Sequence, residues 1–153
     1  MSKLKLSIPS ENFETTITLL DDEAPVTCGS IMRIMPVDGR LMHCASSGQE
    51  SVIELQGEQR VRIEPENWVT NYIPGDVVYW FSQWGDMQYF KGKRINAEIS
   101  FIYGRHVKLR DLNLRETSAN LFGRMDSKLE EFAAISKKTR IEGVKQTLIQ
   151  VLP

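Results

Sequence analysis

The chain has 153 residues, a formal net charge of −1 and 41% hydrophobic residues. We expect a single domain over residues 1–153, because this length supports one sizeable core. The near-zero charge excludes a global field that attracts nucleic acid or anionic lipid, so we expect neither as a partner. No apolar run approaches the ~20 residues of a membrane span, and the first residues lack the apolar block of a signal peptide.

The cysteine and motif content narrows the class further. Cys28 and Cys44 are too few for a disulfide framework, which favours reduced thiols and a cytoplasmic protein. No group of His, Cys and Asp has metal-ligand spacing, and there is no phosphate loop or dinucleotide fingerprint. We therefore expect neither a metal nor a cofactor.

The N-terminal third predicts a β-hairpin followed by a short helix. Residues 4–8 and 13–19 alternate between apolar and polar types, with a break at 9–12. Pro25 suits a first helical turn, and acidic residues 21–23 favour the positive end of a helix. The helix is expected to pack one apolar face on the sheet, formed at helical spacing by Cys28, Ile31, Met32 and Met35.

The middle of the chain alternates between strands and tight turns. Pro74 and Gly75 fit a type II turn, because proline presets the first φ angle and glycine permits the second. No definite element is predicted over residues 104–124. The expected strands are 40–47, 51–55, 60–63, 76–81, 87–91 and 96–103.

The C-terminal part predicts a second helix and a last strand. Residues 127–130 match a capping box, and Gly143 is a helix stop. A final strand is expected over 146–152. With two helices and about eight or nine strands, the chain is predicted to be mainly β, a closed or nearly closed β-barrel. One face of the second helix is expected to carry Phe122, Met125, Leu129, Phe132, Ala133 and Ser136.

The stretch 39–55 brings nucleophile and base residue types close together in the sequence. His43 and Cys44 are neighbours in a predicted strand and point to opposite faces, so they do not form a catalytic pair. Ser47 shares the face of His43 but lies ~13 Å along the strand, beyond hydrogen-bond reach. Covalent catalysis is therefore disfavoured, and two interpretations stay open: a buried histidine bonded to a backbone carbonyl, or a strand face that lines a pocket.

Aromatic residues gather between positions 68 and 84. They form either a flat ligand wall or part of the core. Alternation separates Val78 and Trp80 from Tyr79 and Phe81, so at most one of these pairs lines a given pocket. The remaining aromatic residues of the group are Trp68, Tyr72 and Trp84.

Glu98 stands in an otherwise apolar strand. It shares a face with Ser100 and Ile102, whereas Phe101 and Tyr103 take the other face. A buried carboxylate requires a partner and often marks a site. The alternative interpretation is that Glu98 faces water.

The segment 21–28 resembles the strand-to-helix entry of cyclophilins, with Pro25 and Thr27 at the matching places. Cyclophilins carry Phe-His-Arg on a later barrel strand, and the arginine is catalytic in proline isomerisation. Here Met42-His43-Cys44 stands at that position. The resemblance implies a cyclophilin-like barrel in which a weak S–H donor replaces the guanidinium, so prolyl isomerase activity is not expected.

The chain is more similar to a bacterial family of uncharacterised cyclophilin-like proteins. The similarity departs at Ala45-Ser46-Ser47, where that family carries a tryptophan near Ser46. The resemblance implies the barrel fold and no assigned activity. The shared features are residues 20–25, His43, residues 65–67, 74–76, Tyr79, residues 98–99, 103–104 and 120–123.

We therefore expect binding of a small molecule or short peptide in a cleft on the side of the barrel. One alternative is an enzyme, either a residual prolyl isomerase or a hydrolase or lyase that uses His43 with a carboxylate. Another is a homo-oligomeric assembly protein with aromatic contacts. The candidate ligand-binding residues are His43, Ser47, Glu50, Trp80, Glu98 and Tyr103.

Overall fold

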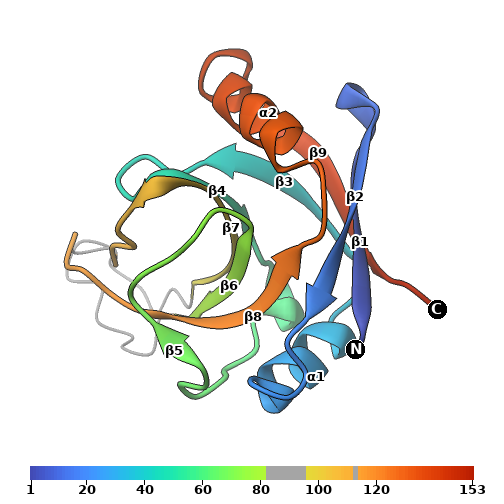
Figure 1. Ribbon diagram of the computed structural model, residues 1–153, viewed down its shortest axis with the longest axis vertical. Helices are drawn as coiled ribbons and strands as arrows, with labels where there is room; N and C mark the ends of the chain where they lie inside the picture. The colour runs from blue at the N-terminus through green and yellow to red at the C-terminus, as the bar shows by residue number, and fades with distance from the viewer. Residues whose placement is uncertain (82–95, 112–113) are drawn as a thin grey trace.

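The computed structural model describes residues 1–81, 96–111 and 114–153. Nine strands of this part form one antiparallel sheet, and all but β5 close into a barrel because β2 pairs with both β1 and β8 (Figure 1). The short strand β5 (Trp68–Val69) adds to β8. Around the barrel the strands are β1 (Lys3–Ile8), β2 (Phe13–Leu19), β8 (Ala119–Met125), β6 (Asp76–Phe81), β7 (Ala97–Val107), β4 (Gly48–Glu54), β3 (Val37–His43) and β9 (Lys145–Val151).

The barrel is filled by alternate side chains of its strands. In a closed barrel, successive residues of a strand point inward and outward. The inward residues form one buried apolar cluster, so the predicted hairpin and the period-two pattern are confirmed. Its members include Leu4, Leu6, Ile17, Leu41, Ile53, Tyr79, Ile99, Phe101 and Phe122.

Helix α1 (Pro25–Arg33) begins at the predicted proline, and its N-terminus is capped from a distant loop. Ala24, at the N-cap position, makes no side-chain cap. The Glu66 carboxylate instead accepts hydrogen bonds from the backbone N–H groups of Val26 at 3.2 Å and Thr27 at 2.7 Å, and from the Thr27 hydroxyl at 2.7 Å. These bonds satisfy N–H groups that have no partner within the helix.

Asn120 of β8 holds this capping loop in place. Its amide donates to the Thr27 hydroxyl at 3.1 Å and to the Glu64 carbonyl at 3.0 Å, and its carbonyl accepts the Glu66 N–H at 3.1 Å. Residues 65–67 thus lock α1 onto the barrel wall, and Cys28 and Ile31 of α1 enter the barrel core.

Helix α2 (Leu129–Glu142) packs on the barrel at its other side from α1 (Figure 1). The Phe132 ring lies 5.9 Å from Phe13 and 5.6 Å from Phe101, centroid to centroid. The predicted capping box is wrong, because Ser127 makes no cap; its carbonyl accepts a bond from the Thr15 hydroxyl at 2.9 Å. Phe122 and Met125 belong to β8 rather than to this helix. Gly143 ends α2 with φ of 90°, as predicted.

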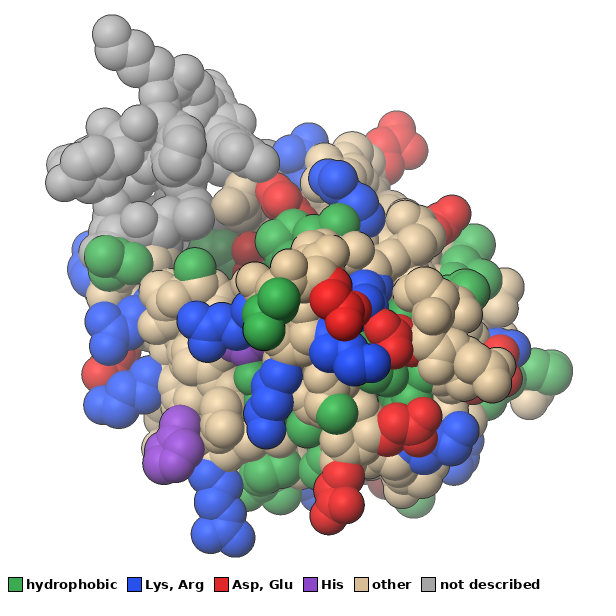
Figure 2. Space-filling view, turned by 90° about the horizontal axis from the view of Figure 1, so that it is seen from above, with side chains coloured by type: hydrophobic (Ala, Val, Ile, Leu, Met, Phe, Trp, Pro, Cys, Tyr) green, Lys and Arg blue, Asp and Glu red, His purple; other side chains and the backbone are tan. Residues whose placement is uncertain are grey.

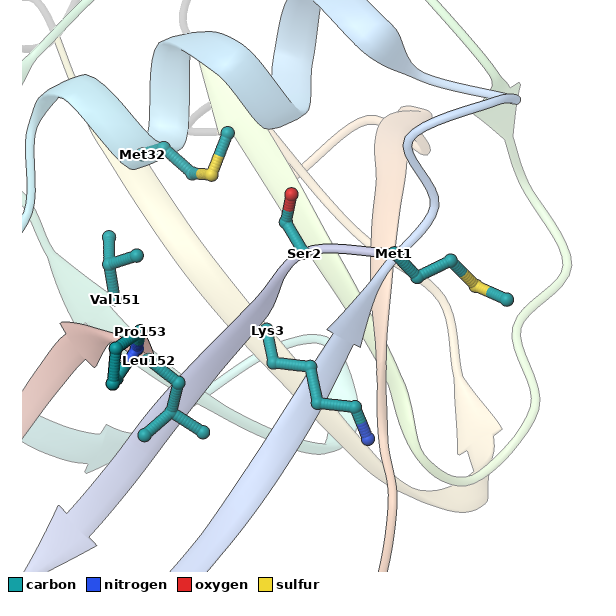
Figure 3. A pocket seen from close by; sticks show the side chains of 7 residues that line it. All are labelled: Met1, Ser2, Lys3, Met32, Val151, Leu152 and Pro153. Carbon is teal, nitrogen blue, oxygen red and sulfur yellow. The ribbon is translucent and has the colours of Figure 1, made fainter.

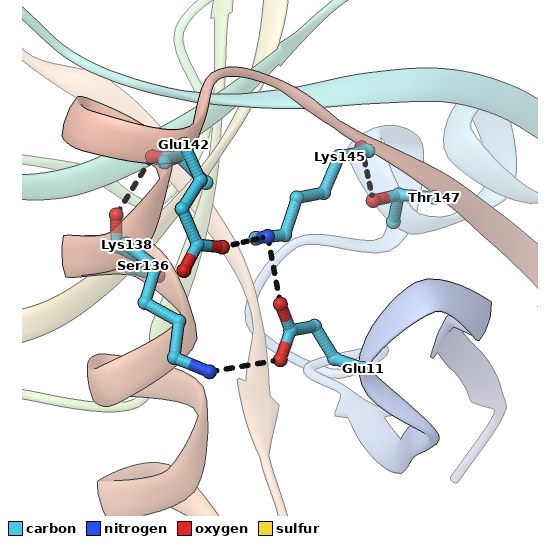
Figure 4. A network of polar contacts seen from close by, with 7 residues as sticks. Glu11, Ser136, Lys138, Glu142, Lys145 and Thr147 are labelled. Carbon is cyan, nitrogen blue, oxygen red and sulfur yellow. Dashed lines mark hydrogen bonds and ion pairs between the residues drawn. The ribbon is translucent and has the colours of Figure 1, made fainter.

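An ion network fastens α2 to the first hairpin and to the last strand (Figure 4). The Lys145 ammonium of β9 lies 2.7 Å from Glu11 and 2.6 Å from Glu142. Lys138 of α2 adds a contact of 3.1 Å to Glu11, which belongs to the 3-10 turn η1 (Pro9–Glu11). Charges of both signs are interspersed over the face that carries α2 (Figure 2).

Several predicted strand boundaries are wrong. The strand expected over 40–47 ends at His43, and a turn separates it from β4. Residues 60–63 form no strand, because the Tyr79 hydroxyl donates to the Val61 carbonyl and docks this segment on the barrel. A second 3-10 turn, η2 (Gly57–Gln59), precedes it. The predicted strand 87–91 and Trp84 lie outside the described residues.

None of the helices in the ranges described above combines the length and the apolar character that crossing a membrane requires.

Candidate functional site

The six predicted site residues lie in three places. His43 and Tyr103 belong to the inner face of the barrel wall, and Glu50, Trp80 and Glu98 belong to its outer face. The division on β7 follows the alternation seen in the sequence, because odd-numbered positions there point inward. One site made of all six residues is therefore excluded.

His43 and Tyr103 form a pair on the inner face. His43 Nε2 lies 2.5 Å from the Tyr103 hydroxyl, and Nδ1 lies 2.7 Å from the Cys44 carbonyl. A carbonyl only accepts, so we assign the hydrogen to Nδ1; in the neutral ring, Nε2 then accepts from the phenol. Burial raises the pKa of Tyr103, and nearby Arg140 opposes that shift. No carboxylate contacts His43 in the described chain, which removes the basis for a His43–carboxylate acid and base.

Ser47 belongs to the turn between β3 and β4, not to the strand face of His43. It is 4% exposed, and its hydroxyl accepts the Arg110 N–H at 3.2 Å. Its carbonyl accepts the Lys108 N–H at 2.9 Å. The strand ends before Ser47, so the parity argument does not reach it. Ser47 anchors the chain after β7.

Polar side chains follow the outer face along β4 and β7. In the register of the sheet, Glu98 lies opposite Glu54 on one side and Trp80 on the other. Ser100 stands one outward position further along β7, and Glu50 lies one outward position beyond it on β4. We call Glu50, Ser100, Glu98 and Trp80 the outer-face strip.

Glu50 is the most deeply buried carboxyl of the outer-face strip. It is 2% exposed, and its Oε2 atom has no hydrogen-bond partner. Burial, and secondarily the charge of Glu98, raises the pKa of Glu50 to about 8. The Ser100 hydroxyl lies beside this carboxyl and offsets part of the shift, but forms no hydrogen bond of regular geometry; Ser100 is itself fully buried. Two unsatisfied buried polar groups therefore stand side by side.

Glu98 is half-buried and forms the more accessible end of the outer-face strip. Burial raises the pKa of Glu98 to about 7, and the opposing Glu54 carboxylate adds to the shift. Burial also raises the pKa of Tyr72, with Glu50 as the second cause. Tyr72 therefore shares the environment of Glu50. None of the ion pairs found among the described residues involves Glu50 or Glu98.

A second apolar cluster surrounds the outer-face strip outside the barrel. Half-buried Trp80 packs against it, whereas Tyr79 and Phe81 point into the barrel core, so the predicted separation of these aromatics is confirmed. Trp68 is 52% exposed and lies apart on β5. The cluster consists of Tyr72, Val78, Ile102, Leu109, Ala119 and Leu121.

The arrangement supports polar binding or proton transfer. In the described ranges, no three His, Cys, Asp or Glu side chains gather in a way that would hold a metal ion. A separate hollow of about 500 Å³ lies beside the two chain ends (Figure 3) and contains no residue of the outer-face strip. It is lined by Met1, Ser2, Lys3, Met32, Val151, Leu152 and Pro153.

Sequence reasoning missed three neighbours of this site, Glu54, Ser100 and Tyr72. Alternation over residues 49–55 places Glu50 and Glu54 on one face, and the same rule joins Ser100 to Glu98. The pairing of β4 with β7 is a long-range contact, which no local pattern reports.

Comparisons with known proteins identify a family and a fold. The model of a family described as a protein of unknown function (DUF3830) matches residues 6–150. No curated protein matches the sequence. The structure of McbB in complex with tryptophan is similar, with a TM-score of 0.68 and 14% identity over 96% of this chain and 44% of that chain. The chain thus spans less than half of McbB.

A second similar structure covers nearly all of both chains. The solution structure of the hypothetical protein AF2241 from Archaeoglobus fulgidus has a TM-score of 0.57 and 19% identity, over 97% of this chain and 93% of that chain. At these identities the two likenesses show the barrel fold alone.

Proposed function

Because the chain belongs to the DUF3830 family, whose function is unknown, we propose a function from the site: the protein binds a small molecule at the outer-face strip. Glu50 and Ser100 form the deep polar end of this site. Glu98 and Trp80 form the accessible end, with one polar and one aromatic side chain. Binding sites for small molecules commonly combine apolar walls with a few convergent polar groups.

The observation that carries this proposal is the unpartnered Oε2 atom of Glu50 on a side chain that is 2% exposed. Leaving a buried polar group without a partner costs about 1–3 kcal/mol, and more when the group is charged. A ligand that bonds to this oxygen removes the cost. The site therefore stores free energy that a bound molecule releases.

The comparison with McbB supports the same kind of function. That protein shares the barrel fold and was solved in complex with tryptophan, which is a small molecule. Short peptides stay as an alternative ligand class. The free thiols of Cys28 and Cys44 support a reducing, cytoplasmic setting, because extracellular proteins tend to oxidise such pairs.

Thermal-shift screening against a metabolite library tests the proposal. A ligand at 100 times its Kd stabilises the folded state by about 2.7 kcal/mol. We expect hits whose shift falls by at least half in Glu98→Gln and stays unchanged in Glu58→Gln, an exposed glutamate of the η2 turn. Hits that are equally strong in Glu98→Gln would place the binding site elsewhere.

Acid–base catalysis at the same carboxyls is the second candidate function. General acids and bases work best when their pKa lies near the working pH, and Glu50 and Glu98 meet that condition. Turnover of a screening hit, followed by mass spectrometry, would show it. A prolyl-peptide assay is expected to give the uncatalysed rate, and native mass spectrometry tests the homo-oligomer alternative suggested by exposed Trp68 and Ile73.

A further inference from the structure

We propose that the ligand of the outer-face strip carries a protonated amino group, which binds against Glu50 and Ser100. This inference rests on the proposed function and adds the chemical class of the ligand. It follows from three features of the site: its charge, its unsatisfied hydrogen-bonding groups, and the position of Trp80.

The charge of the site selects a cation. Glu50, Glu54 and Glu98 all project from the outer faces of two paired strands. The ion pairs that the described residues make leave Glu50 and Glu98 without a basic partner. An isolated buried carboxylate is strongly disfavoured, so it either holds a proton or meets a positive charge. An anionic ligand would add repulsion at the same place.

The hydrogen-bonding groups match an ammonium. A primary ammonium has three donors and no acceptor. Glu50 Oε2 and Ser100 Oγ are neighbouring buried oxygens that have no partner, and both accept hydrogen bonds. Bonds between ionised groups are roughly twice as strong as bonds between neutral ones. An amino group therefore satisfies both oxygens at once.

The position of Trp80 sets the size of the ligand. Ser100 and the Glu98–Trp80 pair stand two residues apart along the sheet, a step of about 7 Å. A flat apolar group attached two carbons from an amine spans that step. Half-buried Trp80 offers it an aromatic face, and the adjoining wall of the outer cluster is apolar.

Binding of an amine is expected to release a proton. The positive charge favours the ionised form of Glu50, whose burial otherwise keeps it protonated near neutral pH. Glu54 and Glu98 face it with negative charge. Tyr72 and Asp76 complete its titratable surroundings, and Asp76 already pairs with Arg124 at 3.3 Å. Alkylamines keep their charge below a pH of about 10, so the affinity is expected to rise about tenfold from pH 6 to pH 8.

Matched probes test the inference on the whole chain. One set is tryptamine, tryptophol and indole-3-propionate; the other is hexylamine, 1-hexanol and heptanoate. Isothermal titration calorimetry is run at pH 6 and pH 8, and at pH 7.5 in phosphate and in Tris. We expect the amine of a set to bind at least tenfold more tightly than its neutral and anionic partners, with proton release that differs between the two buffers.

Variants separate this inference from the proposed function. Glu50→Gln is expected to abolish proton release and to weaken amine binding at least tenfold, and Ser100→Ala to weaken it a few-fold; Glu98→Gln, at an accessible position, serves if Glu50→Gln does not fold. Library hits that are neutral or anionic, lose affinity in Glu98→Gln and bind without proton release would overturn the inference and leave the proposed function intact. Absence of any hit that depends on Glu98 would overturn both.

Discussion

Glu54 of β4 and Glu98 of β7 occupy directly opposed positions in the register of the barrel sheet, and both side chains point outward. Like charges in directly opposed positions of neighbouring strands destabilise a sheet. The pair is kept beside a third carboxyl, Glu50, which is buried. A protein that carries such an arrangement loses stability unless protons or a bound cation compensate. This relationship underlies the first prediction.

The stability of the unliganded protein is expected to fall as the pH rises from 5 to 8.5. Burial raises the pKa of Glu50 to about 8 and that of Glu98 to about 7, both above the model value of 4.5. Between those limits the folded state holds protons that the unfolded chain has released, so each rise in pH favours unfolding. For Glu50 the loss is about 3 kcal/mol.

Urea unfolding at several pH values measures this dependence. Carboxyls whose pKa is lowered, such as Asp126, act mainly below pH 4.5 and leave the window untouched. Glu50→Gln is expected to flatten the profile, whereas Glu58→Gln keeps the slope of the wild type. A wild-type protein that is more stable at pH 8.5 than at pH 5 would contradict the assignment.

Removal of the Glu66 carboxylate is expected to destabilise the protein by about 1–2 kcal/mol, the usual cost of losing a helix cap. In Glu66→Ala, the N–H groups of Val26 and Thr27 lose their acceptor. Glu64→Ala is the matched control, because that exposed side chain only pairs with exposed Arg62 and is expected to change stability by less than about 0.5 kcal/mol. Equal losses in the two variants would show that Glu66 does not cap α1.

The Tyr103→Phe variant is expected to lose about 1 kcal/mol of stability, because the hydrogen bond to His43 Nε2 disappears. Nitrogen-15 spectra of the neutral protein should show His43 protonated at Nδ1, where the Cys44 carbonyl accepts. The exposed ring of His106 provides the internal reference. A wild-type spectrum with the proton on Nε2 would reverse the assignment of this pair.

A single added methyl group at Gly75 is expected to destabilise the protein by about 1 kcal/mol or more. Gly75 has φ of 101° in the turn after Pro74, and L-residues with a side chain are strained there. Gly29→Ala is the control, since its new Cβ meets only Arg33 Nη1 at 3.8 Å; in a helix interior this change stabilises by up to about 1 kcal/mol. Urea unfolding measures both, and a neutral Gly75→Ala would refute the turn assignment.

Local patterns predicted most of the fold. The hairpin of β1 and β2, the start of α1 at Pro25, the end of α2 at Gly143 and the last strand all depend on residues close in sequence. The segment 104–124 contains the end of β7 and all of β8, and its pattern was not interpretable. β8 is covered on both faces by other elements, so it lacks the apolar–polar alternation that marks a half-exposed strand.

The site was less predictable than the fold, because it depends on contacts between distant strands. Alternation correctly separated Glu98 from Tyr103 and Trp80 from Tyr79. It failed for Ser47, since the strand ends at His43 and parity has no meaning across a turn. The approach of Glu50 to Ser100 follows from the register of β4 with β7, which no single segment encodes.

The most direct test of the outer-face site is a carbon-13 titration of the glutamate carboxyls with and without tryptamine, or the matched probe that binds most tightly. The proposal predicts that Glu50 and Glu98 titrate near pH 8 and 7 without ligand, and that ligand shifts both signals while those of His43 and Tyr103 stay in place. Ligand-induced changes confined to His43 and Tyr103, or to the hollow beside Met32, would contradict it.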